Sequence, residues 1–437
     1  MKYPELPNYN QHAETIERWV QLKAEHRSAG IEPILKDAEA AMLSAIKRLE
    51  ALPPDAEQTK QEPDGLTEIK ALRSAGPRRI ANATDNADFP SRLEGALLGR
   101  MAANILGSPV ELWDIPKMAA LAEELGAPFP PTDYWTYVPE PARLRYQKSR
   151  RDEYIRGKLR AVPVDDDIAY TLIGLLIMEE FGPELSVEKV GQAWLKYLPY
   201  AETAERIALE NLKAGTPAAE AATTDNLYRE WIGADIRSDP WGYMSPGWPE
   251  KAAEFAYHDA YISHRRQGIY GEMFFSAAIS AAFVVDDPIE ALKIGLTEIP
   301  QKCALAESIN WALEVAPEIR NYQQARDAMD EEFDIMHKVH TNNNACLTVW
   351  GLSIGGTDFT KVIGETVAMG MDNDCTAATA GSIVGAIVGK AGIPERWYKN
   401  FNNTVISYLN GHETFAISDL LSRFQAQARR VWETAAG

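Results

Sequence analysis

Residues 164–181 read VDDDIAYTLIGLLIMEEF, in which three adjacent aspartates precede an apolar stretch of about four helical turns. Neighbouring carboxylates repel one another at neutral pH unless positive charge lies among them. The start of a helix supplies part of that compensation through its free N–H groups and its dipole. An acidic helix cap with solvated side chains also explains this run, so the run alone does not assign a function.

A second stretch has the same design. Residues 370–389 read GMDNDCTAATAGSIVGAIVG, so Asp372 and Asp374 again precede an apolar helix rich in small residues. Short side chains that offer only oxygen ligands suit a hard cation, and magnesium binds about six oxygens, some of them from water. Two such turns that face each other are predicted to hold one or two ions. The alternative is two unrelated capped helices.

The pattern around these stretches predicts an all-α fold. Helical periodicity recurs from residue 89 onward, alternating segments are scarce, and Ala, Gly and Ser lie within the apolar faces, which allows helices to approach closely. The clearest predicted helices are Arg92–Leu106, Asp167–Phe181, Gly271–Val284, Asp287–Leu296, Lys361–Met369 and Thr376–Gly389. Residues 226–249, NLYREWIGADIRSDPWGYMSPGWP, show little periodicity and are predicted to form a functional loop.

The first 88 residues differ from the rest. Residues 12–51 have helical spacing among many charges, and residues 53–65, PPDAEQTKQEPDG, have the composition of a linker. We therefore divide the chain into a helical N-terminal extension and linker, residues 1–88, and a main domain, residues 89–437. A packing or oligomerisation arm is the simplest interpretation of the extension.

Composition limits the function classes. The 437 residues carry 63 acidic and 44 basic side chains, for a formal net charge of -19, which disfavours nucleic acid as a partner. Three widely spaced cysteines indicate neither a disulfide framework nor a zinc site. The start of the chain lacks the apolar stretch of a signal peptide, and the longest apolar runs are too short to span a membrane. The cytoplasm is the expected compartment, and the oligomeric state stays open.

Taken together, these motifs resemble those of the ADP-ribosylglycohydrolase family, in particular of one bacterial branch. The matching segments follow the family's order from about Phe89 to Trp397, which is roughly 70% of the chain. They are Phe89–Glu111, Asp165–Leu172, His258–His264, Gly268–Met273, His340–Ala345 and Asp372–Thr376. The resemblance implies a compact fold of many orthogonally packed helices.

It also implies a set of metal ligands, together with three departures from the family pattern. The implied ligands are Asp165, Asp166, Asp167, Asp372, Asp374 and Thr376. Asp165 stands where the family usually has threonine. Cys375 stands where many members have a threonine ligand, and a thiol is a poor magnesium ligand, so either Thr376 replaces it or the second ion is held more weakly. Asn104 stands where an aspartate is common.

Further matches imply residues that act on the substrate. Glu111 matches a loop glutamate that approaches the metals in relatives, although an ordinary surface carboxylate is the alternative. The implied substrate-binding residues are Gly268, Tyr270, Gly271, His340, Thr341, Asn344 and Asn373, for which tight turns or helix caps are equally good interpretations. A structural His264–Asp259 pair is as plausible as a functional one. For Arg237, an internal salt bridge with Asp239 is preferred over substrate phosphates.

The resemblance thus predicts a hydrolase that cleaves an N- or O-glycosidic ADP-ribosyl linkage. Its expected cofactor is Mg²⁺, as one or two ions, with Mn²⁺ as a substitute, and its expected partner is an ADP-ribose-like small molecule or protein-linked group. Asp166 or Glu111 is the predicted general base or proton shuttle for a metal-activated water. The alternatives are a related metal-dependent N-glycosidase acting on a nucleoside or small metabolite, and a non-catalytic protein that retains the fold.

Overall fold

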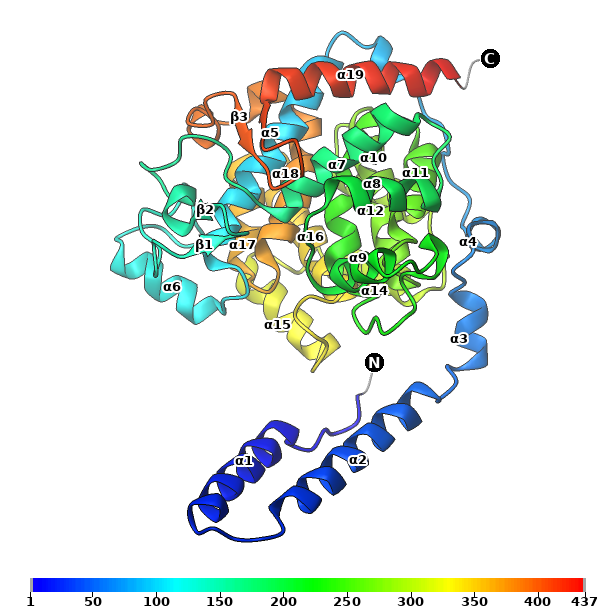
Figure 1. Ribbon diagram of the computed structural model, residues 1–437. Helices are drawn as coiled ribbons and strands as arrows, with labels where there is room; N and C mark the ends of the chain where they lie inside the picture. The colour runs from blue at the N-terminus through cyan, green and yellow to red at the C-terminus, as the bar shows by residue number, and fades with distance from the viewer. Residues whose placement is uncertain (1–2, 435–437) are drawn as a thin grey trace. The chain divides into compact units, whose positions relative to one another are not determined.

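The computed structural model describes residues 3–434, and its secondary structure is almost entirely helical (Figure 1). Its two compact units are Met1–Lys60 and Gln61–Gly437. The α-helices are α1 (Tyr9–Glu25), α2 (Ile31–Glu50), α3 (Ala56–Gln61), α4 (Leu66–Leu72), α5 (Phe89–Gly107), α6 (Ile115–Glu124), α7 (Asp166–Phe181), α8 (Val187–Tyr197), α9 (Thr203–Lys213), α10 (Asp239–Met244), α11 (Pro249–Ala260), α12 (Gln267–Ala282), α13 (Pro288–Leu296), α14 (Ala304–Val315), α15 (Tyr322–Phe333), α16 (Thr341–Gly355), α17 (Phe359–Ala368), α18 (Asn373–Val388) and α19 (Ile417–Thr434).

The strands among the described residues are short. β1 (Leu144–Arg145) pairs antiparallel with β2 (Ser149–Arg150), and β3 (Thr404–Ile406) pairs antiparallel with β4 (Thr414–Ala416). The all-α prediction is therefore confirmed, and all six of the clearest predicted helices are present with ends shifted by a few residues. None of the described helices combines the length and the apolar character needed to span a bilayer.

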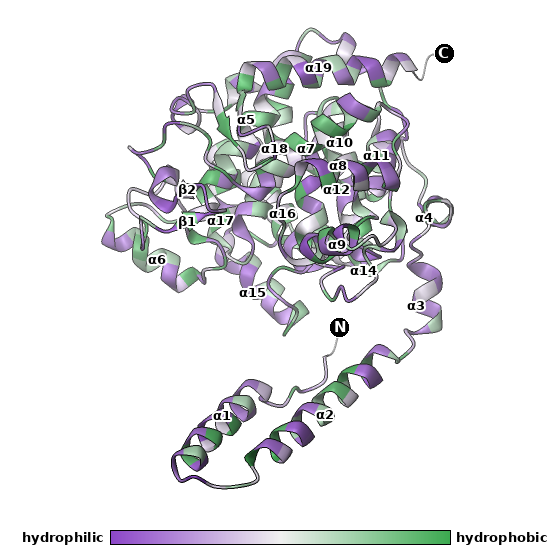
Figure 2. Cartoon of the chain, in the orientation of Figure 1, coloured by the Kyte–Doolittle hydropathy of each residue, from purple (hydrophilic) through white to green (hydrophobic). Residues whose placement is uncertain are grey.

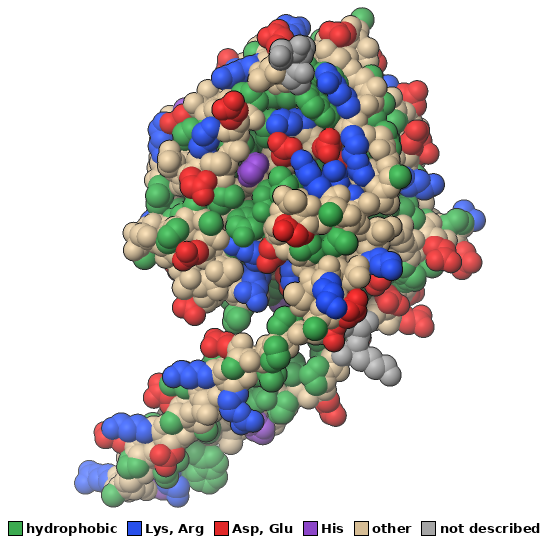
Figure 3. Space-filling view, turned by 90° about the vertical axis from the view of Figure 1, so that its right-hand side faces the viewer, with side chains coloured by type: hydrophobic (Ala, Val, Ile, Leu, Met, Phe, Trp, Pro, Cys, Tyr) green, Lys and Arg blue, Asp and Glu red, His purple; other side chains and the backbone are tan. Residues whose placement is uncertain are grey.

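The first unit is a pair of helices. The sequence pattern predicted one continuous helix over residues 12–51, but α1 ends at Glu25 and α2 begins at Ile31. Gly30, just before α2, has a φ of 86°, which is accessible to glycine and incompatible with a continuing helix. Neither helix contains a buried residue. Hydrophobic side chains such as Trp19, Ile34 and Leu49 are exposed beside charged ones (Figures 2 and 3).

The second unit is organised around α5 and α18, which run antiparallel in contact through glycines. A Cβ atom on Gly99 would lie 2.2 Å from the backbone oxygen of Gly381, and one on Gly95 would lie 2.2 Å from that of Gly385. Only glycine allows the two backbones to approach so closely. At the other end of the pair, a Cβ atom on Gly107 would lie 2.5 Å from the Cα of Asp374. The start of α18 is thereby fixed beside the end of α5.

Residues 226–249, predicted as a functional loop, are mostly short helix. They form a 3-10 helix, η5 (Ile232–Arg237), followed by α10, and most of their side chains are buried. Arg100 on α5 holds this segment against α7, because its guanidinium donates to the backbone oxygens of Ile236 and Asp167 at 2.6 and 2.8 Å and pairs with Asp239 at 2.6 Å. The segment packs as part of the core and forms one wall of the site described next.

Candidate metal centre

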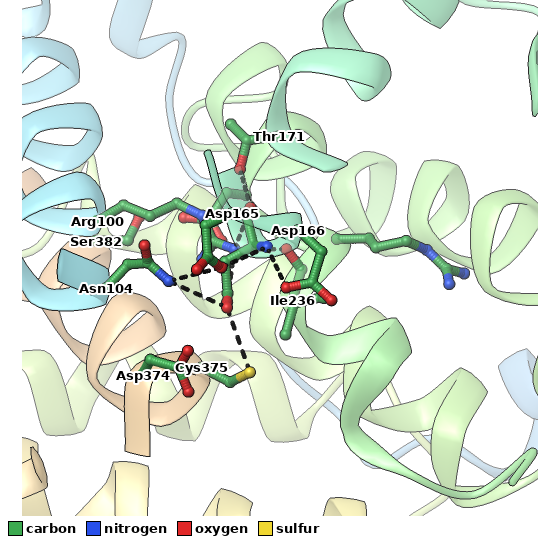
Figure 4. A network of polar contacts seen from close by, with 12 residues as sticks. Arg100, Asn104, Asp165, Asp166, Thr171, Ile236, Asp374, Cys375 and Ser382 are labelled. Atoms are coloured by element: carbon green, nitrogen blue, oxygen red, sulfur yellow. Dashed lines mark hydrogen bonds and ion pairs between the residues drawn. The ribbon is translucent and has the colours of Figure 1, made fainter. Parts of the chain in front are cut away.

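The first acidic turn lies at the start of α7. Asp165 is its N-cap, and its carboxylate accepts a hydrogen bond from the backbone N–H of Asp167 at 3.3 Å. Asp165 and Asp167 are 1% and 0% exposed, so the turn is buried and is no solvated cap. Asn104 on α5 donates from its amide nitrogen to Asp165 at 3.0 Å and to Asp167 at 3.2 Å (Figure 4). Its side chain supplies two N–H donors where another carboxylate would add repulsion.

The second acidic turn, at the start of α18, meets the first. One oxygen each from Asp165, Asp167 and Asp374 lie within 4.8 Å of one another, although more than 200 residues separate the two turns. Asp372, Asp374 and the thiol of Cys375 form a second group with the same spacing. Figure 4 shows the carboxylates of Asp165 and Asp374 facing the same space beside Asn104.

A cation fits this arrangement. Asp372 and Asp374 are buried, and an Oδ1 atom of each has no hydrogen-bond partner among the described residues. An unpaired buried carboxylate oxygen is unfavourable, and a bound cation would satisfy it. The donor set of carboxylate oxygens favours a hard divalent ion over a soft one. The thiol of Cys375 instead donates to Asp167 at 3.3 Å.

The pKa values of these carboxyls report the same crowding. Burial, followed by the charges of neighbouring carboxylates, raises the pKa of Asp166 and Asp374 well above the usual range. For Asp167, burial is again the main cause, partly opposed by Arg100. Burial and then the charge of Glu111 raise the pKa of Asp372 to about 7. Protons therefore compete with a cation for these oxygens, and binding of an ion would release them.

Arg145 supplies the one guanidinium that contacts both acidic turns in the described part of the chain. It donates to Glu111 at 2.8 Å, to Asp165 at 2.9 Å and to Asp374 at 3.3 Å. Burial opposes its charge, but Asp165 and Glu111 raise its pKa well above the usual value. Arg145 thus offsets part of the negative charge and shares two carboxylates with any bound ion.

The hairpin between β1 and β2 positions Arg145 and its neighbour Tyr146. Tyr146 and Gln147, in the three-residue connection between β1 and β2, have φ values of 47° and 57°, which non-glycine residues adopt rarely. The hydroxyl of Tyr146 donates to Asp166 at 2.6 Å, and its backbone oxygen accepts from the hydroxyl of Tyr200 at 2.8 Å. Such a strained turn is maintained by its contacts and is common at functional sites.

Asp166 faces a different space from Asp165. In Figure 4 its side chain points away from the carboxylates of Asp165 and Asp374. It lines a cavity of about 230 Å³, together with Glu111, Asp372, Asp374 and the aromatic ring of Trp231. The acidic centre therefore opens into a space large enough for part of a small ligand.

Comparison with known proteins identifies the family of the chain. The family model described as ADP-ribosylglycohydrolase matches residues 85–430. The chain belongs to the ADP-ribosylglycohydrolase family. Family membership makes it a hydrolase of the glycosidase type. A solved structure titled "ADP-ribosylglycohydrolase-related protein complex" is similar in fold, with a TM-score of 0.50 and 18% identity over 79% of this chain and 99% of that one. No curated protein matches the chain.

The remaining predicted ligand and base of this family member lie close to the centre. Glu111 follows the short 3-10 helix after α5, lines the cavity and pairs with Arg145. Thr376 is buried on the first turn of α18, and its hydroxyl donates to the backbone oxygen of Asp372 at 3.0 Å. That bond leaves the oxygen lone pairs of Thr376 for another partner. The structure therefore brings Asp165, Asp167, Asp372 and Asp374 together, with Asp166 and Glu111 at the adjoining cavity and Thr376 bonded to Asp372.

The predicted substrate-binding residues on α12 lie outside the cavity lining. Tyr270 donates from its hydroxyl to the backbone oxygen of Pro63 at 2.6 Å. A Cβ atom on Gly268 would lie 2.5 Å from the ring of His264, and one on Gly271 would lie 2.0 Å from Asp235. Both glycines allow close packing of neighbouring segments, and substrate contact by these residues stays a prediction.

The same holds for the predicted residues at the start of α16 and for Asn373. His340 caps α16 by accepting from the backbone N–H of Asn342 at 3.2 Å, and the amide of Asn344 donates to the backbone oxygen of Lys338 at 2.8 Å. Thr341 is buried, and its hydroxyl has no partner among the described residues. Asn373 donates to the backbone oxygen of Val367 at 3.1 Å, away from the cavity.

A buried network surrounds Arg237, which forms an internal salt bridge as preferred, although its partners differ from the expected one. Its guanidinium pairs with Glu205 at 2.8 Å, Asp259 at 2.7 Å and Glu272 at 3.3 Å, whereas Asp239 pairs with Arg100. Asp259 therefore bonds Arg237, and the ring of His264 contacts the hydroxyl of Ser263 at 2.8 Å.

Sequence reasoning missed Arg145 and Tyr146. A signal was present, because residues 143–151 read RLRYQKSRR and place five basic side chains within nine residues of an acidic chain. Such a run is unusual enough in this composition to mark the segment as a partner for the acidic turns.

Proposed function

We propose that this glycosidase is a magnesium-dependent enzyme that hydrolyses an N- or O-glycosidic ADP-ribosyl linkage. The observation that carries the proposal is the meeting of Asp165, Asp167 and Asp374 at one point, beside carboxylate oxygens that lack partners. Asp165, Asp166, Asp167, Asp372, Asp374 and Thr376 would hold one or two ions. When bound, Mg²⁺, or Mn²⁺ in its place, would supply a Lewis acid that orients ribose hydroxyls and lowers the pKa of water.

The side chains around the cavity suit the reaction. Cleavage of a ribosyl linkage develops positive charge at the anomeric carbon. Six acidic residues line the cavity, and the described lining contains no lysine or arginine, so the lining favours that charge; the six are Glu111, Asp166, Glu202, Glu205, Asp372 and Asp374.

Asp166 is the candidate general base. Burial and the neighbouring carboxylates raise the pKa of Asp166, which makes its carboxylate a stronger base than that of an ordinary aspartate. The hydroxyl of Tyr146 fixes one of its oxygens, and burial raises the pKa of that phenol, so Tyr146 remains a donor. Glu111, which also lines the cavity, is the alternative base.

The test is turnover before and after removal of the metal. Release of free ADP-ribose from ADP-ribosylated arginine and serine peptides should require Mg²⁺ or Mn²⁺ and should return when the ion is restored. Asp374→Asn and Asp166→Asn should each reduce turnover by about 100-fold or more while leaving the helical circular dichroism unchanged. Normal turnover by chelated, metal-stripped protein would rule the proposal out.

A second candidate is a metal-dependent N-glycosidase for a nucleoside or small metabolite. The size of the cavity favours it, because about 230 Å³ is below the usual range for drug-sized ligands. Adenosine and related ribosides in the same assay separate the two candidates. A non-catalytic role would leave every substrate intact even with metal bound.

For the whole chain we propose a cytoplasmic protein with an N-terminal arm. Cys303, Cys346 and Cys375 are buried thiols, which suits a reducing compartment. We keep residues 1–88 as the extension, with packing or oligomerisation as its role, and note that residues 61–88 belong to the larger compact unit. The net charge of -19 leaves nucleic acid and membrane surfaces as disfavoured partners.

A further inference from the structure

A second hollow adjoins the acidic cavity and has the opposite charge. It is an open groove of about 780 Å³ that shares Glu111, Leu112, Tyr146 and Glu202 with the cavity. Its basic lining residues are Arg143, Arg145, Arg151 and Arg206. Four arginines in one groove stand out in a chain with 19 more acidic than basic residues.

Three of these arginines have weak partners. Arg143 pairs with Glu140 at 3.4 Å and Arg206 with Glu210 at 3.1 Å, and in both pairs the two side chains are exposed. Exposed pairs of this kind contribute little and exchange readily with another anion. Arg151 donates to the backbone oxygen of Pro109, a neutral acceptor. Their charges are therefore available to a ligand.

The arginines also come from separate elements that the fold brings together. Arg145 lies on β1 and Arg143 just before it, whereas Arg151 begins the 3-10 helix after β2 and Arg206 lies on α9. Burial lowers the pKa of Arg151, and the charges of Arg145 and Arg143 lower it further. Like charges held this close repel one another, and a bound anion would remove that repulsion.

We propose that this groove is an anion-binding arm of the active site, in which Arg143, Arg151 and Arg206 bind a phosphate group of the substrate. This inference rests on the proposed function for the position of the ribosyl group, which occupies the acidic cavity. A diphosphate would be repelled by the six acidic residues of the cavity and attracted by the groove. Arginine suits phosphate because its planar guanidinium donates two parallel hydrogen bonds.

The phosphate has two sources that share this chemistry. It is either the diphosphate of an ADP-ribosyl group or a phosphate borne by the acceptor on the other side of the scissile bond. The two sources place the same anion in the same groove, and they differ in whether free ADP-ribose contacts the arginines.

The experiment measures binding by calorimetry with the full-length protein, with no turnover required. The ligands are ADP-ribose, inorganic pyrophosphate and adenosine, each at low and at physiological salt. The variants are Arg151→Gln and the double variant with Arg143→Gln and Arg206→Gln. Arg156→Gln is the matched control, because Arg156 is an exposed arginine paired with Asp133 outside the groove.

Arg151→Gln should weaken pyrophosphate binding about tenfold, as expected for one hydrogen bond to a charged group. The double variant should weaken it at least as much, while adenosine binding and the Arg156→Gln control stay unchanged. Loss of ADP-ribose affinity in parallel assigns the groove to its diphosphate. Unchanged ADP-ribose affinity with weakened pyrophosphate binding assigns it to a phosphate on the acceptor.

Equal pyrophosphate binding by wild type and all groove variants overturns the inference. Arg151→Lys guards against a folding artefact, because it keeps the charge and should retain most pyrophosphate affinity. Since none of these measurements requires bond cleavage, an inactive protein that still binds pyrophosphate through the groove would contradict the proposed function and leave the inference standing.

Discussion

Two clusters of buried carboxylates lie in the same helical unit, and they differ in how their negative charge is compensated. Around Arg237, the carboxylates of Glu205, Asp259 and Glu272 all pair with one guanidinium. In the acidic centre, Asp372 and Asp374 each retain an unpaired buried oxygen. A buried carboxylate that is already paired needs no further partner, whereas a bound cation would satisfy an unpaired one beside a cavity.

The same comparison extends to the two arginines. Arg237 is 1% exposed and lies behind the cavity wall, while Arg145 belongs to a strained hairpin at the mouth of the site and bonds residues that are themselves candidate ligands. Arg237 therefore acts as a permanent counter-ion. Arg145 acts as a counter-ion that a divalent cation would partly replace.

Removal of Arg237 should have the largest effect on stability. Arg237→Met leaves three buried carboxylates without their cation, and removing one partner of a buried pair costs about 3–5 kcal/mol. We expect a large fall in the urea midpoint or failure to accumulate folded protein, and no recovery with Mg²⁺. Recovery by millimolar Mg²⁺ would show that the Arg237 cluster is also a cation site and would break the comparison.

Titration of His340 should have a smaller effect on the free energy of unfolding. Burial, and then the charge of His337, lowers the pKa of His340 to about 4, from 6.5 in the unfolded chain. The unfolded chain therefore binds the proton first as the pH falls. The contribution of His340 to stability is complete above pH 6.5 and is lost between pH 6.5 and 4, by at most about 3 kcal/mol.

His340→Asn isolates this effect, because asparagine keeps an acceptor for the cap of α16 and does not titrate. The difference in the free energy of unfolding between wild type and the variant should be constant above pH 7 and should shift in favour of the variant as the pH approaches 4. A difference that does not change with pH would show that His340 titrates normally in the fold.

Substitution of Arg145 should show that the acidic centre, unlike the Arg237 cluster, responds to Mg²⁺. Arg145→Met removes the competitor for Asp165 and Asp374, so the metal-free protein should be less stable while its affinity for Mg²⁺ rises, by about tenfold. The measurement is the increase in melting temperature on adding Mg²⁺, which should be larger for the variant than for wild type. A smaller increase would mean that Arg145 supports ion binding, for example by orienting Glu111.

The fold could be predicted from the sequence further than the site could. Helical periodicity identified α5, α7 and α18, and two acidic helix starts predicted a cation site. The helical periodicity does not predict that the backbones of α5 and α18 touch at Gly99 and Gly381. That contact places Asp374 beside the end of α5.

The pairings that the sequence did not predict are all contacts between residues on different elements of the fold. Arg145 precedes Asp165 by only 20 residues, but a hairpin turn aims it back at the acidic centre, and a single sequence does not specify that direction. Arg237 and Asp239 are close in sequence, yet each pairs with a partner on another helix. Pairings between distant elements depend on packing, which local patterns do not encode.

The smallest predicted effect concerns Cys375. Burial, and then the charge of Asp167, raises the pKa of this thiol, so it remains protonated and donates to Asp167 instead of offering a ligand. Cys375→Thr places a hydroxyl oxygen, a harder donor, at the same helix start and should strengthen Mg²⁺ binding by a few fold, well below the effect at Arg145. Cys375→Ala is the control, because it removes the thiol without adding an oxygen. If alanine and threonine change the Mg²⁺-induced melting shift equally, position 375 does not contact the ion, and the donors must come from the aspartates and Thr376.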